Sequence, residues 1–215
     1  MEINVKKFLQ LLLAENKKQN LVSRKTTLED LEQHIQDSIQ VLEWVSLAGQ
    51  AVIDIGSGAG FPGIVLAMVQ PDCQMILVES DLKKSLFLQN VKEELGLDNV
   101  RIIRARIEIL GQDSEHRAGY DLCTCRAVAA MTVLLEYGLP LVKPGGRVLM
   151  WKGRSYQQEI TEAQMALQVL GGRIEEVYQY NLMHDKDRTI VAVKKVHPTP
   201  AQFPRKVGAP TKKPL

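Results

Sequence analysis

The glycine-rich segment at residues 52–63 has the residue types and spacing of a ligand-binding loop. It reads Val-Ile-Asp-Ile-Gly-Ser-Gly-Ala-Gly-Phe-Pro-Gly, so an apolar strand runs directly into closely spaced glycines. Glycine has no side chain, which lets the backbone turn sharply and approach a ligand closely. Pro62 suits an early position in a following helix. The segment therefore predicts a strand, a ligand-binding loop and a helix, in this order.

Two classes of ligand fit this loop. Gly58, Gly60 and Gly63 have the spacing of a dinucleotide-binding motif, and Glu79 follows at about the distance expected of a ribose-binding acid. On these residues alone, an NAD-dependent oxidoreductase would fit. Asp54 favours S-adenosylmethionine instead, because a carboxylate there repels a pyrophosphate and attracts the ammonium and sulfonium groups of that cofactor. Glu79 can bind the ribose hydroxyls of either ligand, so it does not discriminate between them.

A turn further along the chain discriminates between these two classes of ligand. The Pro-Gly-Gly sequence at residues 144–146 resembles the turn before the fifth strand of many class I methyltransferases. We therefore expect an S-adenosylmethionine-dependent methyltransferase. The loop residues and strand-end acid predicted to bind this cofactor are Asp54, Gly56, Gly58, Gly60 and Glu79.

Strand-like and helical patterns alternate from residue 51 onward, as a fold that presents such a loop requires. The expected strands are 51–55, 74–79, 100–104, 120–125 and 147–151, and the helices are 62–70, 82–95, 129–139 and 156–170. Two further strand-like segments, 173–180 and 188–196, follow each other without a helix and suit an antiparallel hairpin. The pattern predicts a class I Rossmann-like α/β fold, with a mostly parallel seven-stranded sheet and one antiparallel edge hairpin.

Three regions are expected along the 215 residues. They are an N-terminal helical extension, a cofactor-binding core and a basic, proline-rich tail, at residues 1–48, 49–196 and 197–215. Helical spacing of apolar residues predicts helices over 3–18 and about 27–45. Thr27 and Asp30 have the spacing of an N-cap for the second helix. The tail contains five prolines and is expected to be irregular.

Composition and charge narrow the class of protein. Hydrophobic residues make up 45% and charged residues 24%, as in an ordinary globular protein, and no apolar run is long enough to span a bilayer. The three cysteines form no CxxC pair, which fits a reducing cytoplasm. From Lys194 onward there are six basic residues and no acidic one, which leaves 21 basic against 25 acidic residues before it. Such a basic tail suits a polyanionic partner.

The fourth strand bears on which atom is methylated. Residues 120–127 lack the Asp/Asn-Pro-Pro-aromatic motif of enzymes that methylate exocyclic amines. Cys125 could act as the nucleophile of a cytosine-C5 enzyme, but Cys123 and Cys125 are better explained as small apolar residues on one strand face. A ring nitrogen such as guanine N7 already has a lone pair, so it needs alignment with the methyl group and no general base.

Segments spread over nearly the whole chain resemble one family. They are Asn-Leu-Val-Ser at 20–23, His-Ile-Gln-Asp-Ser at 34–38, the loop at 54–63, Arg-Ala-Val-Ala at 126–129, Lys-Gly at 152–153 and the Phe-Pro-Arg-Lys tail at 203–215. In this order they resemble the 16S ribosomal RNA guanine-N7 methyltransferases, also called glucose-inhibited division protein B. Cys125 and Phe203 depart from the family's usual serine and tyrosine, which puts one local hydrogen bond at each in doubt.

The resemblance implies methylation of guanine N7 at position 527 of 16S ribosomal RNA. It also implies cofactor contacts from Gly56, Phe61, Arg126 and the backbone at Ile107 and Glu108. Arg126, expected at the end of the fourth strand, is the predicted catalytic residue through positioning; it could pair with the cofactor carboxylate or with an RNA phosphate. No metal site is expected, because the histidines are scattered along the chain.

The expected partner is 16S ribosomal RNA or the 30S particle, with no DNA and no membrane. The candidates for RNA contacts are Arg24, Lys152, Arg188, Arg205, Lys206, Lys212 and Lys213. We expect a cytoplasmic monomer. The alternatives are a methyltransferase for a small molecule or another RNA position, the NAD-dependent enzyme, and a non-enzymatic RNA-binding protein with a vestigial loop.

Overall fold

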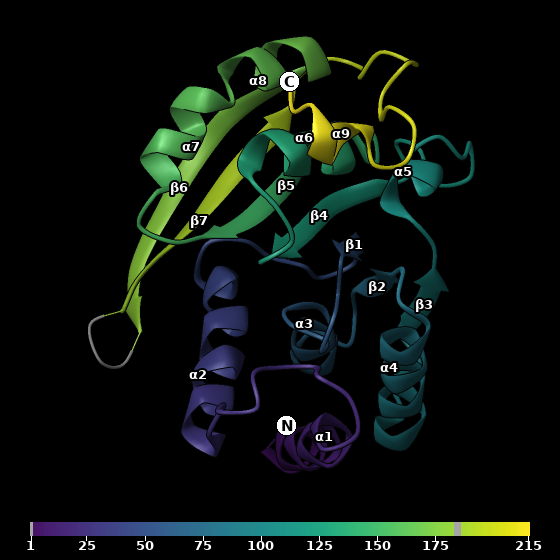
Figure 1. Cartoon of the computed structure of the whole chain (residues 1–215), viewed down its shortest axis with the longest axis vertical. Coiled ribbons are helices and arrows are strands. Elements are labelled where there is room, and N and C mark those ends of the chain that lie inside the picture. Colours follow the sequence, from purple (N-terminus) through teal and green to yellow (C-terminus); the bar gives the residue numbers. More distant parts are fainter. Residues whose placement is uncertain (1, 183–185) are drawn as a thin grey trace.

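A seven-stranded sheet forms the centre of the molecule (Figure 1). The computed structural model describes residues 2–182 and 186–215. The strands are β1 (Ala51–Ile55), β2 (Gln74–Glu79), β3 (Val100–Arg104), β4 (Tyr120–Arg126), β5 (Val142–Lys152), β6 (Gly172–Leu182) and β7 (Lys186–Lys195). They lie in the order β3-β2-β1-β4-β5-β7-β6, with β1 to β5 parallel and β7 antiparallel to both neighbours. The predicted fold class is confirmed.

Helices cover both faces of this sheet. They are α1 (Glu2–Asn16), α2 (Leu28–Ile39), η1 (Gln40–Glu43), α3 (Gly63–Val69), α4 (Leu82–Leu95), α5 (Ile107–Leu110), α6 (Met131–Gly138), α7 (Tyr156–Glu162), α8 (Gln164–Leu170) and α9 (Ala209–Lys212). Figure 1 shows α1 to α4 on one side of the sheet and α6 to α8 on the other. The described helices are too short or too polar to cross a membrane.

Strand alternation divides the core into two clusters. Along β1, Val52 packs on the side of α1 to α4, whereas Ile53 and Ile55 pack on the side of α6 and α8. In β5, Leu149 and Met150 likewise face opposite sides. Because side chains of successive strand residues point to opposite faces, apolar strands of this kind require helices on both.

The N-terminal helices share the core of the sheet. Phe8 and Leu12 of α1 and Leu31 of α2 are fully buried in the same cluster as Leu77 of β2. The predicted cap of α2 is present: the Thr27 side chain accepts from the N3 backbone amide, and the N3 carboxylate accepts from the Thr27 backbone amide. Helix α1 packs on α3 and α4, and α2 packs on α3 and beside β6, so the N-terminal helices extend the helical layer on this side of the sheet.

The tail is more ordered than its composition suggested. Residues 197–215 run over the outer side of α5 and α6, bury Phe203 and end in the short helix α9 (Figure 1). Neither α5 nor α9, each of four residues, was predicted. The fifth strand also begins earlier than expected, since Val142 already pairs with Tyr120 before a shift in register.

Candidate active site

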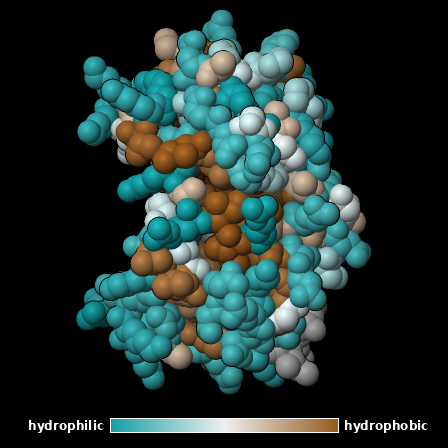
Figure 2. All heavy atoms as spheres, turned by 90° about the vertical axis from the view of Figure 1, so that its right-hand side faces the viewer, coloured by the Kyte–Doolittle hydropathy of each residue, from teal (hydrophilic) through white to brown (hydrophobic). Residues whose placement is uncertain are grey.

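A cavity of 570 Å³ lies at the carboxyl ends of β1, β2 and β4. In a doubly wound sheet this edge is where ligands bind. The residues around it come from separate segments of the chain: Leu21, Val22, His34, Gly56–Ala59, Phe61, Val78–Ser80, Lys84, Ala105–Glu108, Arg126–Ala129, Tyr137, Val207, Gly208 and Thr211. Figure 2 shows the side of the molecule bearing β3, α4 and α5, where hydrophobic atoms gather in a hollow bordered by hydrophilic residues.

The glycine-rich loop and Glu79 form one wall of the cavity. Gly56 and Gly58 have positive φ angles of 69° and 54°. The Gly58 amide donates to Glu79 Oε2 at 3.0 Å, and the Asp81 amide donates to Glu79 Oε1 at 2.8 Å. These two bonds fix the buried carboxylate at the end of β2, where an acid can accept ribose hydroxyls. Gly60 belongs to the same loop but does not line the cavity.

Gly56 is expected to tolerate no side chain. A Cβ at this position would lie 2.6 Å from Cγ2 of Val128, which lines the cavity. Gly49 has a matching φ of 71°, against 69° at Gly56, and nothing within 4 Å of its Cβ position. Gly56→Ala should therefore lower the free energy of unfolding by about 1–3 kcal/mol more than Gly49→Ala, because only the former adds overpacking to backbone strain. Chemical denaturation of both variants measures this difference, and equal losses would contradict it.

Asp54 lies beneath the loop and does not line the cavity. Its side chain is 1% exposed, Oδ1 accepts from Thr124 Oγ1 at 2.7 Å, and Oδ2 has no hydrogen-bond partner among the described residues. Burial raises the pKa of Asp54 to about 6, and the nearby hydroxyls of Ser57 and Thr124 partly offset this shift. Asp54 therefore lies outside the cavity wall in this structure, and its contact with the cofactor stays a prediction.

Arg126 does lie at the cavity, as its predicted role requires. Its Nη1 donates to Asp37 Oδ2 at 2.8 Å, and its guanidinium carbon lies 5.0 Å from the centre of the Phe61 ring. Burial lowers the pKa of Arg126, while Asp37 opposes this shift. Because Phe61 also lines the cavity, the ring and the guanidinium form a continuous surface there.

Asp37 joins four elements behind Arg126. Oδ1 accepts from the Tyr180 hydroxyl at 2.7 Å and lies 3.8 Å from Nε of Arg188, and the indole of Trp151 donates to the Asp37 carbonyl at 2.8 Å. Asp37 thus connects α2 with β4, β5, β6 and β7. In the sequence, Asp37 belongs to the segment 34–38 that carries part of the family resemblance, but nothing there indicates that its partner is Arg126.

Ile107 and Glu108 follow β3 and line the cavity, as the resemblance implied. Glu108 is buried, and its Oε1 accepts from the Gly208 amide at 2.9 Å and from the Tyr137 hydroxyl at 3.3 Å. Tyr137, Val207, Gly208 and Thr211 also line the cavity, and sequence analysis missed all four. The Phe-Pro-Arg-Lys motif is the sequence signal for this part of the chain, but its basic residues predict contacts with RNA and not a wall of the cavity.

The residues predicted to contact RNA are spread around the molecule. Lys152 is buried; its Nζ donates to Glu159 Oε2 at 2.6 Å and to the Ala129 carbonyl at 3.1 Å. These contacts argue against the predicted phosphate contact for Lys152. Arg205 is paired with Glu136 in the same way. Arg188 is half-buried beside Asp37. The others are exposed: Arg24, Lys206, Lys212 and Lys213.

The cysteines are placed as apolar core residues. All three are free and buried, and burial raises the pKa of Cys125 to about 12 and that of Cys123 well above its usual value. A thiol of this kind is not ionised and cannot act as a nucleophile. Within the described ranges, no group of three or more His, Cys, Asp or Glu residues is arranged to hold a metal ion.

Comparison with known proteins decides the family. The family model described as rRNA small subunit methyltransferase G matches residues 1–191. The chain belongs to this family. The protein named ribosomal RNA small subunit methyltransferase G from Syntrophomonas wolfei is 51% identical over 215 residues, the whole of both chains. Its namesake from Roseiflexus castenholzii is 42% identical over 205 residues, covering 95% of this chain and 87% of the relative.

Solved structures share the fold at low sequence identity. A SAM dependent methyltransferase from Aquifex aeolicus superimposes with a TM-score of 0.60 at 19% identity, covering 79% of this chain and 94% of its own. M. jannaschii TYW2 in complex with AdoMet gives a TM-score of 0.60 at 14% identity, with coverage of 80% and 78%. These similarities support the class I fold of the family member described here.

Proposed function

We propose that this chain transfers the methyl group of S-adenosylmethionine to N7 of guanine 527 in 16S ribosomal RNA. The observation that carries the proposal is the cavity at the carboxyl ends of β1, β2 and β4, formed by the residues that the family resemblance assigns to the cofactor. Gly56, Phe61, Ile107, Glu108 and Arg126 all line it. Family membership supports ribosomal RNA as the substrate.

The cavity has features that suit this cofactor. Gly56 lines the cavity, and a Cβ at this position would collide with Val128, so this part of the wall requires glycine. Glu79 is held by two backbone amides in a position to accept from the ribose hydroxyls. Arg126 lines the cavity at the end of β4, as a partner for the cofactor carboxylate or for an RNA phosphate. When bound, S-adenosylmethionine supplies an electrophilic methyl group.

The residues of the chain act by alignment and exclusion of water. Guanine N7 attacks with its own lone pair and loses no proton, so a general base is not needed. Burial lowers the pKa of His34, which favours a neutral ring beside Phe61 at neutral pH. Arg126 and Phe61 provide a rigid edge against which the reacting groups can be oriented.

Exposed or half-buried basic residues remain available to RNA on several parts of the surface. We propose Arg24, Arg188, Lys206, Lys212 and Lys213 as contacts to phosphates of 16S RNA or the 30S particle, and exclude Lys152 because it is buried in an ion pair. The enzyme acts as a monomer in the cytoplasm, without DNA or membrane.

The proposal is tested by methyl transfer. The protein is incubated with methyl-labelled S-adenosylmethionine and unmodified 16S RNA or 30S particles, and nucleosides are separated by mass spectrometry. We expect one labelled 7-methylguanosine, mapped to position 527 by nuclease fragments. Label at another nucleotide would refute the target. Cofactor binding without transfer to any RNA would favour a small-molecule acceptor, and no cofactor binding would favour the dinucleotide class.

A further inference from the structure

The C-terminal segment, residues 203–215, forms part of the cavity wall. Val207, Gly208 and Thr211 line the same cavity as Gly56 and Glu79, although they lie more than a hundred residues away in sequence. Within the sheet, β3 lies beside β2, and α5 follows β3. If Glu79 at the end of β2 accepts from the ribose, the neighbouring α5 and the segment 203–215 would flank the adenine of the bound cofactor.

Arg205 fastens this segment to α6. Its Nε lies 2.9 Å from Glu136 Oε1, and its Nη2 lies 2.6 Å from Glu136 Oε2. The Arg205 amide also donates to Glu136 Oε1 at 2.8 Å, and Nη2 donates to the Lys213 carbonyl at 2.8 Å. The Glu136 side chain is 1% exposed, so without Arg205 it would be a buried, unpaired carboxylate. The guanidinium is therefore engaged inside the protein.

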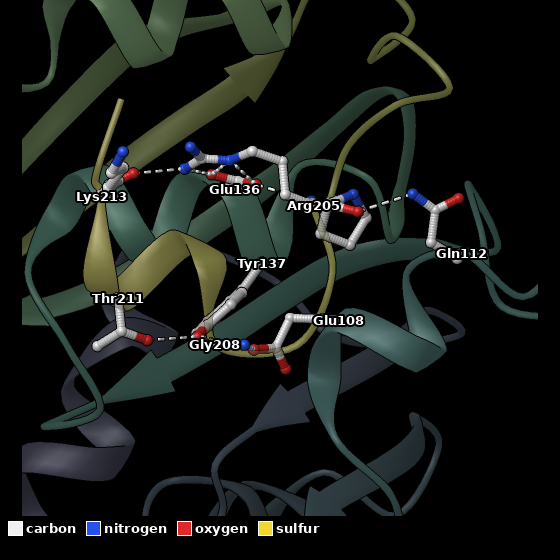
Figure 3. A network of polar contacts seen from close by, with 9 residues as sticks. Glu108, Gln112, Glu136, Tyr137, Arg205, Gly208, Thr211 and Lys213 are labelled. Carbon is white, nitrogen blue, oxygen red and sulfur yellow. Dashed lines mark hydrogen bonds and ion pairs between the residues drawn. The ribbon is translucent and has the colours of Figure 1, made fainter.

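A second group of bonds connects the segment to the cavity itself (Figure 3). The Tyr137 hydroxyl lies 3.3 Å from Glu108 Oε1 and 3.2 Å from Thr211 Oγ1, and the Gly208 amide donates to the same Glu108 oxygen at 2.9 Å. On the outer side, Gln112 donates to the Pro204 carbonyl at 2.7 Å. Tyr137 therefore links α5, α6 and α9 at the surface of the cavity.

We propose that residues 203–215 complete the cofactor site: the bonds of Tyr137 and Glu108 with the Thr211 hydroxyl and the Gly208 amide position the wall against the adenine of S-adenosylmethionine, and Arg205 holds that wall in place. In this arrangement Tyr137 is a positioning residue. The main role of the basic segment 203–215 is to form part of the cofactor site, and contact with RNA is a secondary role. Docking of the segment and cofactor binding stabilise each other, since a ligand that binds only the docked state shifts the chain toward that state.

Tyr137→Phe tests the link in the absence of RNA. This change removes only the hydroxyl between Glu108 and Thr211, and we expect the affinity for S-adenosylhomocysteine, measured by calorimetry, to fall about tenfold. The matched control is Tyr120→Phe: both tyrosines are 7% exposed, and the Tyr120 hydroxyl bonds His116 away from the cavity. Tyr120→Phe should keep wild-type affinity. Equal affinities for both variants would overturn the proposal.

Hydrogen exchange separates a cofactor wall from a merely structural anchor. In the wild type, S-adenosylhomocysteine should slow exchange of amides in residues 203–215, including Gly208. Arg205→Gln should weaken S-adenosylhomocysteine binding and remove this protection, whereas Lys17→Gln, which removes the same charge from an exposed position outside the segment, should do neither. Protection that is unchanged by the cofactor in the wild type would overturn the inference. The inference rests on the proposed function, and failure of the wild type to bind S-adenosylhomocysteine at all would refute that function itself.

Discussion

Replacement of Arg126 by methionine is expected to lower the free energy of unfolding by about 3–5 kcal/mol and to reduce methyl transfer by about 100-fold or more. The stability loss follows because Asp37, with a side chain 6% exposed, would lose its 2.8 Å ion-pair partner inside the protein. The Tyr180 hydroxyl and the more distant Arg188 would remain as its only described side-chain partners. The loss of transfer follows because the guanidinium lines the cavity beside Phe61.

A double variant distinguishes these two effects. An asparagine in place of Asp37 can still accept from Tyr180 but carries no charge, so Asp37→Asn combined with Arg126→Met should recover much of the stability lost by Arg126→Met alone. Methyl transfer should stay low, because the group at the cavity is still missing. Recovery of transfer together with stability would show that Arg126 acts only through the fold. Arg147→Met is the control for the loss of a guanidinium group. It breaks the ion pair with Glu175, which is more exposed than the pair of Arg126 with Asp37.

Much of the fold could be predicted because it depends on local patterns. Apolar runs of five or six residues located β1, β2 and β3, and the Thr27 cap located the start of α2. The short helices α5 and α9 have too few residues for a helical period. Their positions depend on contacts with distant segments, such as Gly208 with Glu108.

Residues of the candidate site that adjoin a strand end could be predicted from the sequence. Contacts that depend on a partner distant in sequence could not. Arg126 ends β4 and could be placed, but its pairing with Asp37 joins positions 89 residues apart. Lys152 ends β5, but the direction of its side chain depends on the ion pair with Glu159 of α7. Ala127 has a positive φ of 55° at the cavity, a conformation that alanine gives no reason to expect.

Asp54 is the residue of this region whose ionisation should most clearly change the free energy of unfolding with pH. Burial raises the pKa of Asp54 from 3.8 to about 6, so the folded protein holds this proton more tightly than the unfolded chain. The Asp54 contribution to the free energy of unfolding should therefore fall as pH rises from about 4 through 6, and remain low above that. Asp54→Asn should remove this dependence and stabilise the protein at pH 7.5 by up to about 3 kcal/mol.

The same substitution should weaken cofactor binding despite the gain in stability. S-adenosylmethionine carries a sulfonium charge that S-adenosylhomocysteine lacks, so an ionised Asp54 beneath the loop attracts the former more strongly. In the wild type, the ratio of the two affinities should shift toward S-adenosylmethionine as pH rises through about 6, and in Asp54→Asn it should stay constant. Calorimetric titrations from pH 5 to 8 measure both ligands. A wild-type ratio that does not change with pH would mean that the carboxylate supports the loop without acting on the cofactor charge.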